Sequence, residues 1–163
     1  MKRATHVKYD PLPIIEARVY VRLMRAADAL SRGAEALLKS HGLSGTQYNV
    51  LRILRGAGDE GLACREIGCR LISRDPDITR LLDRMESRGW IARTRETNDR
   101  RVVKTRISSE GLRLLAELDK PVDELHRRQF CHLPASQLRR LSNLLGRACK
   151  QEELEGEEEY LPD

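Results

Sequence analysis

Apolar residues recur at spacings of three and four over residues 14–41, directly after Pro11 and Pro13. This spacing is typical of an amphipathic helix, because residues three and four apart share one helix face. A helix over 14–41 would extend about 42 Å at 1.5 Å per residue, which is more than a small domain needs to cover its own core. The pattern therefore predicts a long first helix whose apolar face packs against a second partner.

Three shorter helical patterns follow the first helix. Residues 43–46 are predicted to form a turn, and a short helix then runs to three closely spaced glycines that begin at Gly56. The next helix covers 63–71, with Ala63 at the position where a Ser or Thr would cap it. The first of these two short helices is expected to support the third helix from behind.

The third helix, over residues 75–89, has the clearest start and end. Asp75 is predicted to cap it, Pro76 suits its first position, and Asp77 favours the positive end of the helix dipole. Gly89 ends it, because glycine tolerates a positive φ. The buried stripe is expected to be Ile78, Leu81, Leu82 and Met85. The exposed positions are expected to be Asp77, Thr79, Arg80, Asp83, Arg84 and Arg88.

Two β-rich runs come next, Trp90–Arg95 and Val102–Ile107, joined by a polar loop over 96–101. Helical patterns resume at Ser108, and a last helix opens near Pro134. The order of helix, helix, strand, basic loop and strand predicts a winged helix-turn-helix. The fold class is therefore expected to be mainly α with a small β wing (α+β).

The length of 163 residues predicts one domain. Within it, residues 11–41 and 112–150 are expected to be flanking helices for association, and 43–111 the winged-helix lobe. Residues 152–163 carry seven acidic and no basic side chains, so we expect a disordered, solvated tail.

The chain is basic, with a net charge of +5 and a pI near 9.2, and leaving out the acidic tail raises the charge to +12. A basic body suits a polyanionic partner, because neutralising phosphates releases condensed counterions. The alternative is an ordinary soluble surface that happens to be basic. Charge alone does not decide between the two.

The third helix carries the candidate DNA contacts, because a helix in the major groove reads base edges with its first two turns. These residues are Thr79, Arg80 and Arg84, with Asp77 close by. An arginine here could bond a guanine through O6 and N7. The alternative is that the arginines pair with Asp77, Asp83 or Glu86 on a solvated helix face.

The loop between the two β-rich runs carries a second candidate group. Asn98, Asp99, Arg100 and Arg101 sit where a hairpin tip can place cations in a minor groove. Asp99 is too short to read bases there, and is expected to hold an arginine in pose or to serve the turn. An ordinary charged turn explains either cluster alone, but less readily both, one element apart.

These residues together resemble the MarR family of bacterial transcriptional regulators. The resemblance covers residues 43–118 closely and the flanking helices by layout only. It is carried by Asp77–Glu86, Arg88–Ile91, Asp99–Arg101 and Ile107–Gly111.

The resemblance implies a homodimer, in which dimerisation helices from both chain ends interlock and each subunit presents one winged helix to half of a pseudo-palindromic operator. It also implies a repressor relieved by a small aromatic or phenolic effector bound between the dimerisation helices and the DNA-binding lobe. The bulky residues Tyr20, Met24, His41, Tyr48 and Trp90 lie near that expected crevice. Each is more easily a core or interface residue, so the ligand site stays unassigned.

Two features depart from the family pattern. Many members have Ser or Thr where this chain has Pro76 and Asp77, so Asp77 could instead accept a hydrogen bond from a cytosine amino group. Members that sense peroxide carry a cysteine in the first helix, and this chain has none there. Thiol sensing through Cys64 or Cys69 is an alternative, but we expect both to be buried structural cysteines.

Other function classes have less support. The histidines are scattered, and no phosphate loop or nucleophile elbow is present, so the chain is not expected to be an enzyme or to need a cofactor. His126, Cys131 and His132 suggest a metal sensor, but adjacent positions point to different helix faces, and no metal site is expected. The sequence has no run of 18 apolar residues and no secretory signal, so we expect a cytoplasmic protein with no membrane partner. The main rival is a winged helix that binds protein and never touches DNA.

Overall fold

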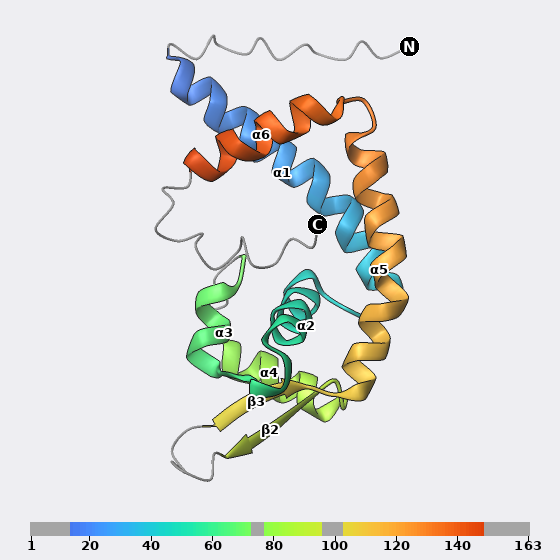
Figure 1. Ribbon diagram of the computed structural model, residues 1–163. Coiled ribbons are helices and arrows are strands. Elements are labelled where there is room, and N and C mark those ends of the chain that lie inside the picture. Colours follow the sequence, from blue (N-terminus) through green and yellow to red (C-terminus); the bar gives the residue numbers. More distant parts are fainter. Residues whose placement is uncertain (1–13, 73–76, 96–102, 149–163) are drawn as a thin grey trace, which may run out of the picture. The chain divides into compact units, whose positions relative to one another are not determined.

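The computed structural model describes residues 14–72, 77–95 and 103–148 (Figure 1). The chain divides into two compact units within its first helix, between Gly33 and Ala34. The described part of the first unit is the N-terminal part of that helix. The second unit contains the rest of the helix and all the other described elements.

The described elements are mainly helical with a small sheet, which confirms the predicted fold class. The helices are α1 (Ile15–Ser40), α2 (Gly45–Ala57), the short 3-10 helix η1 (Gly58–Glu60), α3 (Cys64–Arg70), α4 (Ile78–Ser87), α5 (Ser109–Phe130) and α6 (Ala135–Ala148). The strands are β1 (Leu62–Ala63), β2 (Ile91–Arg95) and β3 (Val103–Ile107).

The sheet is antiparallel, with β3 in the middle of the order β1-β3-β2. Ile91 pairs with Ile107 at one end of the β2–β3 ladder, and Arg95 pairs with Val103 at the other. The sequence analysis missed β1, which pairs Leu62 with Thr105. Two residues are too few to show the alternation that identifies a strand.

The core of the second unit is built from leucines, with contributions from α2, α3, α4 and α5. Leu54, Met85, Leu115 and Leu118 are fully buried in it. Gly111 lets the first turn of α5 approach β2, because a Cβ there would lie 2.3 Å from the carbonyl oxygen of Trp90. The start of α5 is therefore packed closely against Trp90, which directly precedes β2.

The start of α2 differs from the prediction, whereas α3 begins after Ala63 as predicted. Residues 45 and 46 belong to α2 rather than to a turn, because Ser44 caps α2 and exchanges hydrogen bonds with Gln47 in a capping box. Before α3, Ala63 has no side-chain acceptor, and the Glu66 carboxylate reaches back to its N–H at 2.6 Å instead. That hydrogen bond lowers the pKa of the Glu66 carboxyl.

The terminal helices contribute little to this core. Leu38 is the one buried residue of α1, and α6 has none. The exposed large apolar side chains of these helices are Ile15, Val19, Tyr20, Leu23, Met24, Leu141, Leu144 and Leu145. None of the helices in the described part of the chain is long and apolar enough to span a membrane.

Candidate nucleic-acid interface

Helix α4 begins two residues later than predicted. Asp77 is its cap, with non-helical φ and ψ of −129° and 51°, and its Oδ1 accepts a hydrogen bond from the Arg80 N–H at 3.3 Å. The predicted cap Asp75 and the predicted first helical residue Pro76 lie outside the described residues. Asp77 was expected inside the helix, but its carboxylate caps the helix by accepting from the free N–H of Arg80.

The predicted division of α4 into two faces is confirmed. Leu81, Leu82 and Met85 are buried, and Ile78 packs partly buried against them. The residues predicted to be exposed, which are Asp77, Thr79, Arg80, Asp83, Arg84 and Arg88, are all exposed. The apolar stripe therefore fixes which side of the helix faces outward.

The end of α4 is also the predicted one. Gly89 has a φ of +72°, and its N–H donates to the Glu86 carbonyl at 2.8 Å. The N–H of Trp90 donates to the Met85 carbonyl at 3.1 Å, which completes a Schellman motif. Local hydrogen bonds therefore pair backbone groups at both ends of α4.

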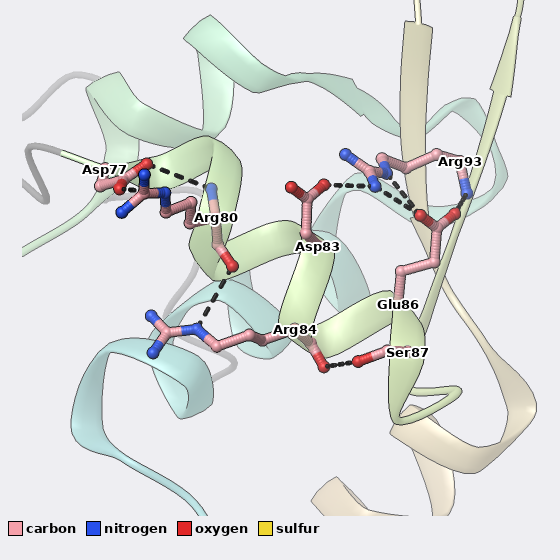
Figure 2. Close-up of polar contacts among 7 residues, drawn as sticks. All are labelled: Asp77, Arg80, Asp83, Arg84, Glu86, Ser87 and Arg93. Carbon is pink, nitrogen blue, oxygen red and sulfur yellow. Dashed lines mark hydrogen bonds and ion pairs between the residues drawn. The ribbon is translucent and has the colours of Figure 1, made fainter.

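The two candidate arginines of α4 extend to the same side (Figure 2). Nε of Arg80 lies 3.1 Å from Oδ2 of Asp77, and the Arg80 side chain is 82% exposed. Nε of Arg84 donates to the Arg80 carbonyl at 3.3 Å. Together with Asp83, these three residues line an open surface hollow.

The two acidic residues further along α4 pair with a strand residue that the sequence analysis did not identify. Arg93 of β2 donates through Nη2 to Oδ1 of Asp83 at 2.6 Å, and through Nε to Oε2 of Glu86 at 2.8 Å. Its backbone N–H donates to Oε1 of Glu86 at 3.1 Å. Figure 2 shows both carboxylates turned towards Arg93, on the other side of α4 from Arg84.

These contacts shift the pKa values of Glu86 and Arg93 so that the charged form of each side chain is favoured. Hydrogen bonds from the Arg93 side chain lower the pKa of the Glu86 carboxyl, and hydrogen bonds to Glu86 raise the pKa of the Arg93 guanidinium. The expected alternative, arginines of α4 paired with acids of α4, holds for Arg80 and Asp77. The ion pairs of Asp83 and Glu86 run to the strand.

A signal for Arg93 was present in the sequence. Alternate residues of a strand point to the same face of the sheet, so Arg93 shares a face with the buried Ile91. An arginine on the face that packs against a helix needs an anionic partner there. The acids three residues apart on α4, Asp83 and Glu86, were the available ones.

Other arginines around the site serve structural contacts. Arg88 donates to the Gly42 carbonyl at 2.8 Å and stacks 4.8 Å from the centre of the Trp90 ring. Arg106 donates to the Asp59 carbonyl and to Thr94 Oγ1, both at 2.6 Å. Arg88 thus links the end of α4 to the segment before α2, and Arg106 links β3 to η1 and β2.

The second predicted group, Asn98, Asp99, Arg100 and Arg101, lies outside the described residues. The β2–β3 ladder is described as far as the pair of Arg95 and Val103. The acidic tail over 152–163 also lies outside the described part of the chain.

The expectation for the cysteines is wrong in part. Cys69 is exposed and Cys64 is half-buried, so neither is a fully buried core residue. The buried residues of this segment are Ile67 within α3 and Leu71 directly after it. Both cysteines therefore lie at the edge of the core. Among the described residues, His, Cys, Asp and Glu side chains form no group of three that could hold a metal ion.

The bulky residues near the expected effector crevice have separate environments. Trp90 is buried in the core, and Tyr48 packs against that core with Arg52 5.9 Å from its ring centre. His41 is exposed at the end of α1, where its Nδ1 lies 3.1 Å from the Leu37 carbonyl oxygen.

Comparison with known proteins gives one consistent family. The sequence model that describes the MarR family matches residues 43–103 of this chain. A crystal structure of a MarR transcription factor from Planctomyces limnophilus is 40% identical, covers 85% of this chain and 98% of its own, and superposes with a TM-score of 0.64. A mutant MarR of Escherichia coli, solved in complex with operator DNA, is 26% identical, covers 82% of this chain and 95% of its own, and has a TM-score of 0.72.

A curated relative, the transcriptional repressor MprA of Escherichia coli, is 27% identical over 114 residues. The match covers 70% of this chain and 65% of the repressor. This chain thus spans a little under two thirds of the length of that relative.

Proposed function

Because this chain belongs to the MarR family, we propose that it is a DNA-binding transcriptional regulator that reads base pairs with α4. The observation that carries the proposal is the division of α4 into a buried apolar stripe and an exposed face with Thr79, Arg80 and Arg84. A helix held in this way on a core can enter a major groove without disturbing its own packing.

Each exposed residue of α4 has a chemical role in this proposal. Arg80 and Arg84 can each donate hydrogen bonds to O6 and N7 of a guanine. These hydrogen bonds would replace the contacts that the two side chains make in the free protein. Thr79 can contact either a base edge or a phosphate. Asp77 is proposed to hold the helix start and to position the Arg80 side chain, in place of the cytosine contact considered from the sequence.

The basic residues of the wing, Arg100 and Arg101, are proposed to add minor-groove or phosphate contacts. Such contacts set the register of the protein on the duplex but carry little base information. Asn98 and Asp99 are proposed to shape the turn that presents the two arginines.

The active form is proposed to be a homodimer. The exposed apolar side chains of α1 and α6 form faces that a second copy can cover. Two-fold symmetry would then place the two α4 helices about 34 to 36 Å apart, or a multiple of this distance, on a pseudo-palindromic operator.

The sign of regulation is proposed to be repression, relieved by a small aromatic or phenolic effector. The similarity to a transcriptional repressor of Escherichia coli supports repression. Footprinting of the protein's own promoter, with and without phenolic compounds, tests both parts.

Binding to a duplex from upstream of its own coding sequence tests the proposal directly. The affinity should fall steeply with salt, with a slope of about −0.9 for each phosphate neutralised. Arg80→Ala should relax the preference at one base pair by about 1 to 3 kcal/mol, whereas Arg101→Ala should weaken all duplexes alike. Arg140→Ala, which removes an exposed arginine from α6, is the matched control and should change neither.

Binding that is weak and independent of salt for every duplex would contradict the proposal. It would favour instead a winged helix that binds protein. Equal behaviour of Arg80→Ala and Arg101→Ala would contradict the division between reading helix and wing.

A further inference from the structure

Helix α4 carries acidic groups that would oppose DNA if nothing offset them. Asp83 lines the same open hollow as Arg80 and Arg84, and its side chain is 52% exposed. A carboxylate at this position would lie near the phosphates that flank a major groove, and like charges side by side are costly. Without a cation to offset them, the carboxylates of α4 would therefore weaken its binding to DNA.

Arg93 supplies the missing charge from outside the helix. Its Nη2 lies 2.6 Å from Oδ1 of Asp83 and 2.5 Å from Oε2 of Glu86, so one guanidinium bridges carboxylates from successive turns of α4. The Arg93 side chain is 26% exposed, less than either partner. A partly buried arginine with two carboxylates holds its geometry better than an exposed pair, because its planar donors match both acceptors.

We propose that Arg93 is a positioning residue for DNA binding, which neutralises the acidic side of α4 and draws the Asp83 carboxylate towards β2. This proposal rests on the proposed function. Arg93 contacts no base. It sets the electrostatic field in which Arg80 and Arg84 meet the duplex, and it ties the base of the wing to the reading helix through the Glu86 carboxylate.

The proposal separates charge from mere bracing of the strand. If Arg93 acts by neutralising Asp83 and Glu86, then removing those two negative charges makes Arg93 dispensable for DNA binding. If it only braces β2, removing the acids leaves the defect of an Arg93 variant in place. If it contacts phosphate itself, the defect also persists.

Four proteins test these possibilities: the full-length wild type, Arg93→Gln, the double variant Asp83→Asn with Glu86→Gln, and the triple variant that combines all three changes. Asparagine and glutamine keep the oxygen acceptors for the Arg93 hydrogen bonds while removing charge. Affinity for the upstream duplex is measured at several salt concentrations, and thermal unfolding followed by circular dichroism checks that each variant is folded.

Arg93→Gln should weaken binding about tenfold, the effect expected when a carboxylate near phosphates loses its cation. The triple variant should return to within about threefold of the wild type. The double variant should bind at least as tightly as the wild type, since two negative charges near the phosphates are gone. Arg93→Lys keeps the positive charge but loses the planar set of guanidinium donors, and it should retain most of the DNA affinity.

Three results would overturn the role of Arg93: wild-type affinity in Arg93→Gln, a triple variant as weak as Arg93→Gln, or a double variant weaker than the wild type. The double variant keeps the test decisive if Arg93→Gln does not fold. A wild-type protein that binds no duplex in a salt-dependent manner would overturn the proposed function, and this proposal with it.

Discussion

The winged-helix lobe and the terminal helices use the same apolar pattern in opposite ways. In the lobe, residues at helical spacing such as Leu54, Met85 and Leu118 are fully buried. On α1, Val19 and Tyr20 are 56% and 64% exposed, and α6 has no buried residue. The apolar pattern of the lobe is buried, and the apolar pattern of the terminal helices is largely exposed.

This difference assigns separate tasks to the two regions. A lobe that is complete by itself can hold α4 in a fixed orientation, which DNA reading requires. Helices with unburied apolar faces gain stability when a second copy covers them, because burial removes apolar surface from water. The following predictions would break or sharpen this contrast.

The largest effect is expected from a cavity in the lobe. Leu118→Ala should destabilise the protein by about 2 to 5 kcal/mol, because the side chain is fully buried and its space cannot refill. Urea unfolding followed by circular dichroism measures the change. Leu144→Ala on α6, at a position 51% exposed, is the control when unfolding is measured at a concentration low enough for the protein to be monomeric, and it should then change stability by less than about 0.5 kcal/mol. Equal losses would show that α6 packs as tightly as the lobe.

The second prediction concerns association rather than folding. If the proposed dimer forms through α1, Val19→Glu with Leu23→Glu should leave the protein monomeric at micromolar concentration, because charges would enter the apolar face that the second copy covers. Sedimentation velocity measures this, and the helical circular dichroism signal should remain.

Asp28→Lys is the control for that variant, since nine residues place Asp28 on the opposite face of α1 from Val19. Its i,i+4 ion pair with Arg32 is solvent-exposed and contributes little. A dimer that survives the two glutamates would show that another surface holds the copies together.

A smaller effect is expected at the start of α4. Asp77→Ala should cost about 1 kcal/mol, because the helix loses the acceptor for the Arg80 N–H. Thermal unfolding gives the total, and hydrogen exchange of the first-turn amides should show the loss locally. Asp123→Ala, an exposed acid within α5, is the control and should leave both unchanged. Faster exchange throughout the lobe would contradict a local capping role.

The sequence was sufficient where side-chain periodicity decides structure, and insufficient where one contact decides it. The spacing of Leu81, Leu82 and Met85 fixed the inner face of α4, and Gly89 its end. The start of α4 was misplaced because both Asp75 and Asp77 can cap a helix, and local preferences do not rank them.

Two features depend on contacts between segments distant in sequence. Strand β1 exists because it pairs with β3, and a two-residue strand has no period of its own. The role of Arg93 follows from its position against Asp83 and Glu86, seven to ten residues away on another element. The alternative drawn from the pattern along one helix, in which those two acids pair with arginines of α4, does not describe their ion pairs.

The smallest effect is expected from the ion pair between Glu86 and Arg93. Its hydrogen bonds lower the pKa of the Glu86 carboxyl in the folded protein, so the unfolded state takes up a proton first as the pH falls. The stabilisation is therefore complete above the unfolded pKa of 4.5 and is lost as the pH falls through the folded value. Because Glu86 is 38% exposed, solvent screening limits the contribution to about 0.5 kcal/mol.

The contribution of the Glu86 charge is measured from the unfolding free energies of the wild type and Glu86→Gln between neutral pH and pH 3. The difference between them should be constant at neutral pH and shrink in acid, whereas the difference between wild type and Leu118→Ala should not follow the titration of Glu86. A Glu86→Gln difference that is constant throughout would show that the pair contributes through its hydrogen bonds and not through its charge. The contrast between the lobe and the terminal helices would then rest on apolar burial alone.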